Sequence, residues 1–266
     1  MPPSRTGLIG SLNPFRSFVI ALQFLTLVPV RVRGPLSSGE LGGSLVYFPV
    51  IGALIGGILA LVGYALSTVS SSLLAAAIVV ALGLVLTGLL HFDGLLDTVD
   101  GLFGGANREE RLAIMRDSRV GSFALAAGTC DILIRLAAVN VLIGAEGFLG
   151  IVWAAAASRF AMAYTVARFK TARDAGFSFD FQLGVSALTA VFAGLIALAL
   201  GYALVGPASL ALVFGALALA HLAGMLAVSK VGGLTGDIYG ATNEVVEVAT
   251  LIALALLWPM LSGPLR

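Results

Sequence analysis

SLLAAAIVVALGLVLTGLL at residues 72–90 and HFDGLLDTVDGLFGG directly after it, at residues 91–105, decide the fold. The first stretch contains no charged residue and, as a helix, is long enough to cross a hydrocarbon core about 30 Å thick. The second stretch contains three aspartates within eight positions. Charged side chains at membrane depth are costly and usually face a bundle interior or a watery cavity. The pair of stretches therefore predicts a membrane helix with acidic chemistry at its end.

Apolar stretches of this kind continue along the whole chain, which has 266 residues and is 59% hydrophobic but only 11% charged. An ordinary soluble domain is about 25% charged. We therefore expect one integral membrane domain over residues 1–266, an all-α polytopic transmembrane bundle of about seven to eight helices. The expected spans are 15–30, 44–69, 72–90, 122–145, 148–166, 183–205, 207–228 and 245–261. Pro14 and Pro29 bracket the first, so it can also be broken or lie in the interface.

The charges are concentrated in alternate loops. Most basic residues fall in the connections 31–43, 91–121, 167–182 and 229–243, whereas those near Ser70, Glu146 and Gly206 contain none. The positive-inside rule places the basic loops, and with them the acidic segment, at the cytoplasmic face of a bacterial-type plasma (inner) membrane. The net charge is only +1, which argues against nucleic acid as a partner and leaves membrane lipid. The sequence leaves homo-oligomerisation open.

The acidic segment predicts a metal site. On a helix, Asp93, Asp97 and Asp100 fall within an arc of about 60°, so their carboxylates point into one volume. Clustered acids in apolar surroundings require a cation or raise one another's pKa. Magnesium suits carboxylate and phosphate oxygens, so we expect Mg²⁺ and a phosphate-bearing substrate. Three roles are open for His91: a base, a phosphate donor or a polar helix cap. The glycines of the segment either form turns or let a phosphate approach the backbone closely.

A second segment, at residues 108–121, carries four arginines beside the acidic one. Guanidinium groups bind phosphate oxygens in bidentate fashion. We expect Arg111, Arg116 and Arg119 to bind substrate phosphate and Arg108 to anchor the chain at the lipid headgroups. Asp117 either completes the metal site or holds an arginine in place.

A third segment, GGLTGDIYGATNEVVE at residues 232–247, leads into the last apolar span. A glycine-rich turn before a helix exposes backbone N–H groups that favour anions, and Thr235 is counted with the substrate-binding residues. Asp237 is a candidate catalytic group, as a further metal ligand or a general base. An alternative role for Glu244 and Glu247 is to complement the positive end of the dipole of the last helix.

Polar residues also occur inside the apolar spans. Asp131 and Arg135 have the i, i+4 order that favours a structural ion pair. Arg159 has no acid nearby in sequence, so it needs a partner from another helix or a bound anion, and it is a further substrate-binding candidate. His221 is expected to be a polar packing group.

The three segments together resemble the cobalamin synthase family, the adenosylcobinamide-GDP ribazoletransferases. The resemblance rests on the order and spacing of 91–101, 111–121 and 232–241, with weaker similarity at 24–30, 47–52 and 157–159. It implies that adenosylcobinamide-GDP and α-ribazole, or its 5′-phosphate, are joined with magnesium to give adenosylcobalamin, or its phosphate, and GMP. Ser122-Phe-Ala124 departs from the family pattern, where a glycine is expected soon after the Asp-Ser-Arg segment.

Two other classes compete with this interpretation. A CDP-alcohol type membrane phosphotransferase also has an aspartate-rich helix, but its second aspartate pair follows the first more closely than Asp117 follows Asp100. A cation or proton transporter could use the aspartates as an ion path, but transporters often show inverted repeats with broken helices, and none is evident in the sequence.

Overall fold

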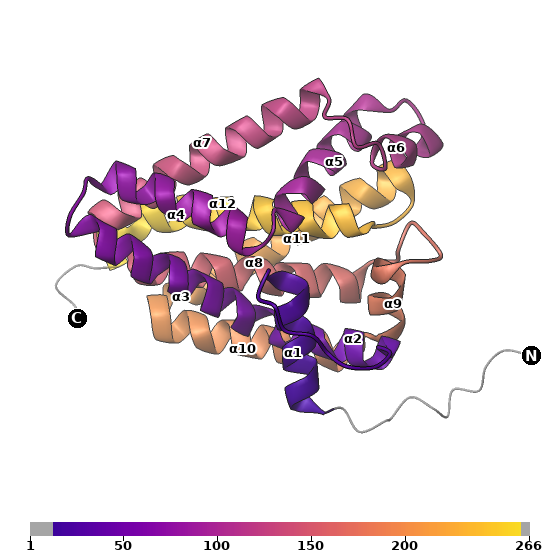
Figure 1. Cartoon of the computed structure of the whole chain (residues 1–266), viewed down its shortest axis with the longest axis horizontal. Coiled ribbons are helices and arrows are strands. Elements are labelled where there is room, and N and C mark those ends of the chain that lie inside the picture. Colours follow the sequence, from indigo (N-terminus) through magenta and orange to yellow (C-terminus); the bar gives the residue numbers. More distant parts are fainter. Residues whose placement is uncertain (1–12, 262–266) are drawn as a thin grey trace, which may run out of the picture.

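The computed structural model describes residues 13–261, which form an all-α bundle (Figure 1). The expected fold class is confirmed. The elements in chain order are α1 Pro14–Leu25, α2 Ser38–Ser44, the 3-10 helix η2 Leu45–Tyr47, α3 Phe48–Ser67, α4 Ser72–Leu86, α5 Leu90–Gly104, α6 Arg108–Ile114, α7 Ser122–Gly144, α8 Phe148–Arg168, α9 Phe177–Gly184, α10 Ala187–Val205, α11 Ala208–Val231 and α12 Gly236–Leu261.

Six of the described helical segments are long and apolar enough to cross a membrane, and a bent pair, α4 with α5, could make a seventh. The described chain therefore has six to seven candidate crossings, where the sequence predicted seven to eight. The expected span 15–30 is wrong, because α1 has only 12 residues and ends at Leu25. The expected straight span 72–90 is also broken, because the chain turns by 86° between α4 and α5. Gly88 and Leu89 both have positive φ angles at this break, a conformation that cannot continue an α-helix.

Helix α8 lies at the centre of the bundle, where close packing is possible because many of its residues are small. Ala154, Ala156 and Ala161 are fully buried, and neighbouring helices pack closely around them. On α3, a Cβ at Gly52 would stand 2.3 Å from the Ala155 carbonyl oxygen, so only glycine permits this contact. Small residues at such crossings are typical of membrane helix packing.

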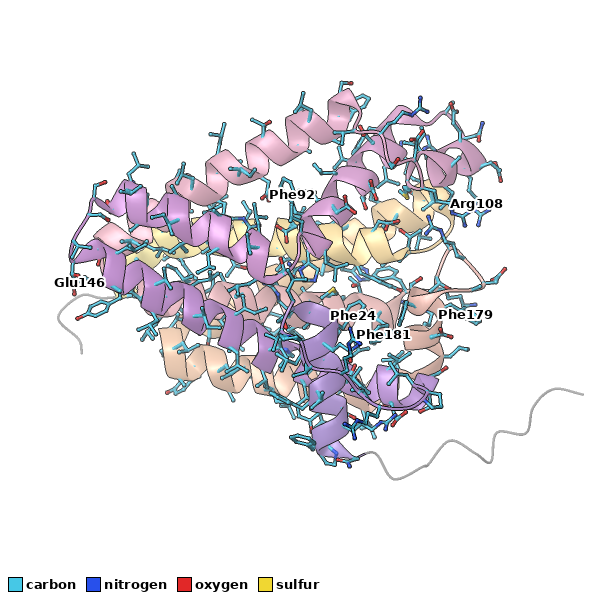
Figure 2. The ribbon with its side chains drawn as sticks, viewed as in Figure 1. Phe24, Phe92, Arg108, Glu146, Phe179 and Phe181 are labelled. Atoms are coloured by element: carbon cyan, nitrogen blue, oxygen red, sulfur yellow. The ribbon has the colours of Figure 1, made fainter. Side chains whose placement is uncertain are left out.

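The charged connections gather at one end of the bundle. Figure 2 places Arg108 at this end and Glu146 at the opposite end of the long axis. Helices α2 and α9 pack together there, while the Arg108 side chain donates to the carbonyl of Ala172.

The last of these connections is shorter than predicted. Since α11 continues to Val231 and α12 begins at Gly236, only residues 232–235 lie between the helices.

Candidate active site

Helix α5 carries the three aspartates on one face, as the spacing predicted. Asp93 is exposed, Asp97 is half-buried and Asp100 is buried. All three line a pocket of about 300 Å³, here called the acidic pocket, together with Arg116, Asp117 and Arg119. The α5 helix thus brings the acidic segment and the end of the arginine segment into one place.

Asp100 also has a structural partner that the sequence did not reveal. Its carboxylate oxygens accept hydrogen bonds from the backbone N–H groups of Gly121, at 2.6 Å, and Ala124, at 2.8 Å. These N–H groups belong to the first turn of α7, which has no cap from its own side chains. A Cβ at position 121 would stand 2.7 Å from the carboxylate, so a larger residue there would push Asp100 out of its present position. Asp100 therefore caps α7 from a neighbouring helix.

Asp237 joins the aspartates of α5 from the first turn of α12. A Cβ at Gly94 would stand 2.7 Å from the Asp237 carbonyl oxygen, so α5 and α12 cross in close contact. The charges of Asp93, Asp237 and Asp100 all act on the Asp97 carboxylate. Four carboxylates from two helices therefore share one electrostatic environment.

Thr235 lies outside the pocket in which it was expected to bind substrate. Its side chain is fully buried, and its hydroxyl donates to Asp237 Oδ2 at 3.1 Å and accepts from the Ile238 N–H at 3.4 Å. The residue thus closes the first turn of α12 and orients Asp237.

The fit of this site to magnesium depends on its donor chemistry. Within residues 13–261, no three His, Cys, Asp or Glu side chains lie close enough together to hold a metal ion directly. Carboxylate oxygens are nevertheless the donors that Mg²⁺ prefers, and the ion usually keeps several waters between itself and the protein. The acidic pocket therefore has the type of donor atom that magnesium prefers. Asp100 is the exception, because its carboxylate is already bonded to α7.

One predicted phosphate-binding arginine, Arg111, and the predicted headgroup anchor, Arg108, are both used within the protein. Arg111 donates from Nη1 to the carbonyl of Lys230 at 3.2 Å, and Arg108, expected at the lipid headgroups, donates from Nε to the carbonyl of Val231 at 2.9 Å. Both carbonyls belong to the last turn of α11, where positive charge is favourable. These arginines attach α6 to the end of α11.

Arg119 and Asp117 form an exposed pair. The Arg119 guanidinium donates to both Asp117 oxygens, with Nη2 at 2.5 Å from Oδ2. These bonds lower the pKa of Asp117 to about 2. The alternative that Asp117 holds an arginine is therefore realised in the structure, and Arg119 lines the acidic pocket as half of this pair.

Arg116 and Arg173 are the arginines best placed for an anion. Arg116 lies in the wall between the acidic pocket and a neighbouring pocket of about 540 Å³. Arg173 lines that second pocket and lies 3.7 Å from Asp237 Oδ2. Its Nε and Nη2 atoms are buried without a hydrogen-bond partner among the described residues. Sequence reasoning counted Arg173 only as a basic loop residue, since nothing in the sequence links it to Asp237.

His91 lies on the side of α5 that faces a third, largely apolar cavity. Its side chain is 1% exposed, and neither ring nitrogen has a hydrogen-bond partner within residues 13–261. This cavity has a volume of about 250 Å³, and its lining also includes Asp93, Asp237 and Tyr239. His91 is therefore not an exposed helix cap, and it lies next to the carboxylates.

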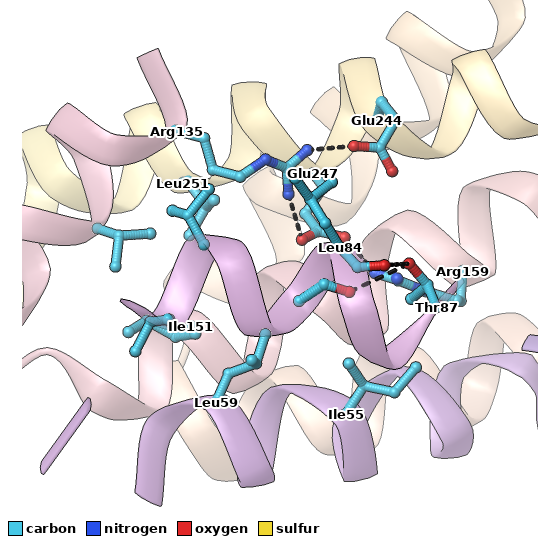
Figure 3. A pocket seen from close by; sticks show the side chains of 14 residues that line it. Ile55, Leu59, Leu84, Thr87, Arg135, Ile151, Arg159, Glu244, Glu247 and Leu251 are labelled. Atoms are coloured by element: carbon cyan, nitrogen blue, oxygen red, sulfur yellow. Dashed lines mark hydrogen bonds and ion pairs between the residues drawn. The ribbon is translucent and has the colours of Figure 1, made fainter. Parts of the chain in front are cut away.

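Arg159 is buried in an ionic cluster (Figure 3). It pairs with Glu247 of α12, which also accepts from Ser158 at 3.1 Å. Arg135 joins the cluster through Glu247 at 2.6 Å and Glu244 at 2.5 Å. Of the two alternatives predicted for Arg159, a helix partner or a bound anion, the structure shows a helix partner, Glu247.

The same cluster contains Glu244, Glu247 and Asp131, whose roles differ in part from those that the sequence predicted. Glu244 and Glu247 are buried well beyond the first turn of α12, so they do not serve its helix dipole. Asp131 lies 3.3 Å from Arg135, as the sequence predicted, but as one member of a network that joins α7, α8 and α12. His221 bonds to the Tyr164 hydroxyl at 2.9 Å and is a packing group, as expected.

Comparison with known proteins identifies the family. The family model described as cobalamin-5-phosphate synthase matches residues 17–255. A protein of Roseiflexus sp. (strain RS-1) named adenosylcobinamide-GDP ribazoletransferase is 38% identical over 256 residues, which cover 93% of this chain and 92% of that protein. Proteins of the same name from Syntrophobacter fumaroxidans and Pseudomonas aeruginosa are 38% and 34% identical, over 91% of this chain and 98% of each relative. No solved structure matches the chain significantly. The chain therefore belongs to the cobalamin-5-phosphate synthase family.

Proposed function

We propose that this integral membrane protein is an adenosylcobinamide-GDP ribazoletransferase. It joins adenosylcobinamide-GDP to α-ribazole, or to its 5′-phosphate, and releases GMP. The observation that carries the proposal is the meeting of the α5 aspartates with Asp237 and Arg173 beside the end of the arginine segment, in a chain similar to named ribazoletransferases over most of its length.

The reaction requires a diphosphate to be held while a hydroxyl attacks it. A ribose hydroxyl of the acceptor attacks the phosphorus that carries cobinamide, the bond from this phosphorus to the GMP oxygen breaks, and the hydroxyl proton passes to a base. The attacking group is not the 5′-hydroxyl, because α-ribazole 5′-phosphate is also an acceptor and keeps its 5′-phosphate in the product. Arg116 and Arg173 line the wall beside the carboxylates, where guanidinium groups offset the negative charge of the diphosphate and of departing GMP. His91 and the carboxylates of Asp93 and Asp237 are the candidate bases nearest the site.

Magnesium supplies charge neutralisation and a template for the diphosphate when it is bound. Asp93 and Asp97 are the residues that would hold it, because neither carboxylate has a hydrogen-bond partner among the described residues. Asp237 is the third candidate, since Asp100 is bonded to α7 and Asp117 to Arg119. Of the four predicted ligands, the proposal thus keeps Asp93 and Asp97. Asp237 replaces Asp100 and Asp117 as the third ligand.

The site faces the cytoplasm in this proposal, at the plasma (inner) membrane. The charged connections gather at the end of the bundle that carries the acidic pocket, and their arginines and lysines favour the cytoplasmic side. Nucleotide substrates are also found on that side.

The direct test is an assay with purified protein in detergent or nanodiscs. Adenosylcobinamide-GDP, α-ribazole and magnesium are combined, and adenosylcobalamin and GMP are measured by chromatography. We expect equal amounts of the two products, with none when either substrate or magnesium is omitted. Absence of adenosylcobalamin from the complete mixture, with folded protein, would refute the proposed function.

A further inference from the structure

The apolar cavity beside His91 is walled by aromatic rings. Phe24, Phe48 and Phe181 pack against one another with ring centres 5.0 to 6.2 Å apart, and Figure 2 shows Phe24 and Phe181 next to each other. All three line the cavity, together with Phe177 and Tyr239. We call this space the aromatic cavity. Its walls come from α1, α3, α5, α8, α9 and α12, so it is built by the fold rather than by one loop.

Polar atoms in the walls of this cavity lack partners. The Tyr239 hydroxyl and both ring nitrogens of His91 are buried without a hydrogen bond within residues 13–261. Leaving such groups unpaired costs free energy, so buried polar atoms are rarely left without a partner. An apolar space with a few convergent polar groups is typical of a site for a small organic ligand. A lipid acyl chain could fill the space but could not satisfy these atoms.

The position and size of the aromatic cavity decide which substrate fits it. Asp93 lines both this cavity and the acidic pocket, so the two spaces meet at its carboxylate. A nucleoside whose base occupies the aromatic cavity therefore has its ribose near Asp93 and Asp237, where the diphosphate is attacked. The volume of about 250 Å³ is below the usual 300–1,000 Å³ of ligand pockets. It suits one flat base and excludes a corrinoid.

We propose that the aromatic cavity binds the heteroaromatic base of the α-ribazole acceptor, with Tyr239 as the residue that donates a hydrogen bond to the ring nitrogen of the base. The inference rests on the proposed function and assigns a subsite within it. The phenylalanine rings stack against the faces and edges of the base. The Tyr239 hydroxyl recognises the nitrogen that is not attached to ribose, which carries a lone pair.

The first test removes only the Tyr239 hydroxyl. Tyr239→Phe should raise the KM for α-ribazole about fivefold, the effect of one neutral hydrogen bond. The KM for adenosylcobinamide-GDP and the kcat should stay unchanged. Tyr164→Phe is the matched control, because its hydroxyl bonds to His221 outside the cavity, and both KM values should stay at the wild-type level. An unchanged KM for α-ribazole in Tyr239→Phe, or a rise in the other KM instead, overturns the assignment.

The second test fills the cavity. Val166 is 3% exposed and lines it, so Val166→Phe places extra atoms where the base would lie. We expect a rise of about tenfold or more in the KM for α-ribazole, and a smaller rise for a riboside whose base is a single imidazole ring. Equal rises for both acceptors contradict the proposal.

The two levels of inference fail in different ways. Wild-type protein that forms no adenosylcobalamin refutes the proposed function. Active wild-type protein whose Tyr239→Phe and Val166→Phe variants show normal KM values for α-ribazole refutes only the cavity assignment. If Val166→Phe does not fold, as judged by size-exclusion chromatography, the Tyr239→Phe result decides.

Discussion

Gly94 of α5 lies so close to Asp237 of α12 that a Cβ on Gly94 would stand 2.7 Å from the Asp237 carbonyl oxygen. The contact is reinforced by Gly240, where a Cβ would stand 3.1 Å from the His91 Cα. These two glycines set the distance between the helices that carry His91, the α5 aspartates and Asp237. The geometry of the site therefore depends on residues that have no side chain.

Gly94→Ala should impair the site by separating α5 from α12. Overpacking of this kind costs about 1–3 kcal/mol of stability, and displacement of Asp237 should lower kcat/KM by about tenfold or more. Thermal unfolding and the transfer assay would measure the two effects. Gly104→Ala is the matched control on the same helix, because its nearest contact, 3.7 Å from Ile114, is ordinary. Equal behaviour of the two variants would count against the helix crossing.

Asp100→Asn should destabilise the protein as well as impair activity. An amide has one acceptor oxygen, so it cannot accept from both Gly121 and Ala124 as the carboxylate does. We expect a loss of about 1–3 kcal/mol, seen as a lower Tm. Asp97→Asn, with no such bond to lose, should leave Tm unchanged or raise it. A normal Tm for Asp100→Asn would show that Asp100 does not cap α7.

Glu247 should matter more for stability than Glu244. It pairs with both Arg135 and Arg159, whereas Glu244 pairs with Arg135 alone. Glu247→Gln leaves Arg159 as a buried charge without its carboxylate, a change that typically costs about 3–5 kcal/mol. Glu244→Gln leaves Arg135 with Glu247 and Asp131, so the fall in Tm should be smaller. The reverse order of the two Tm values would contradict the charge arrangement.

The orientation is tested with single cysteines. Cys130 is the one cysteine of the sequence, so Cys130→Ser gives a background without thiols. Asn107 and Ala175 are exposed and lie close in sequence to Arg108 and Ala172, which bond to each other at the charged end of the bundle. Glu146 is exposed at the opposite end. In intact cells an impermeant thiol reagent should label Glu146→Cys but reach Asn107→Cys and Ala175→Cys only after lysis. Labelling of Asn107→Cys in intact cells would contradict the proposed orientation.

The acidic face of α5 could be predicted because it follows from the helical period alone. Asp93, Asp97 and Asp100 lie on one helix and one face, so no knowledge of other helices was needed. The break after Leu86 was missed, because an apolar run gives no sign that Gly88 and Leu89 will take positive φ angles.

The remaining parts of the site depend on contacts between distant segments. Arg173 reaches Asp237 across more than sixty positions of sequence, and Glu247 meets Arg159 across almost ninety. The partners of Arg111 and Thr235 are backbone and neighbouring groups that a sequence motif does not specify. For these residues the motif identified the region correctly but not the role of each side chain.

The central claim is that Asp93 and Asp97 of α5, with Asp237 of α12, act together as the magnesium site for the proposed ribazole transfer. Asp97→Asn tests it most directly, because Asp97 lies among the charges of Asp93, Asp237 and Asp100. The variant should insert and remain monodisperse, lose at least about 10–100-fold in adenosylcobalamin formation, and recover in part at raised magnesium. Near-normal ribazole transfer by Asp97→Asn, with an unchanged magnesium requirement, would contradict the account.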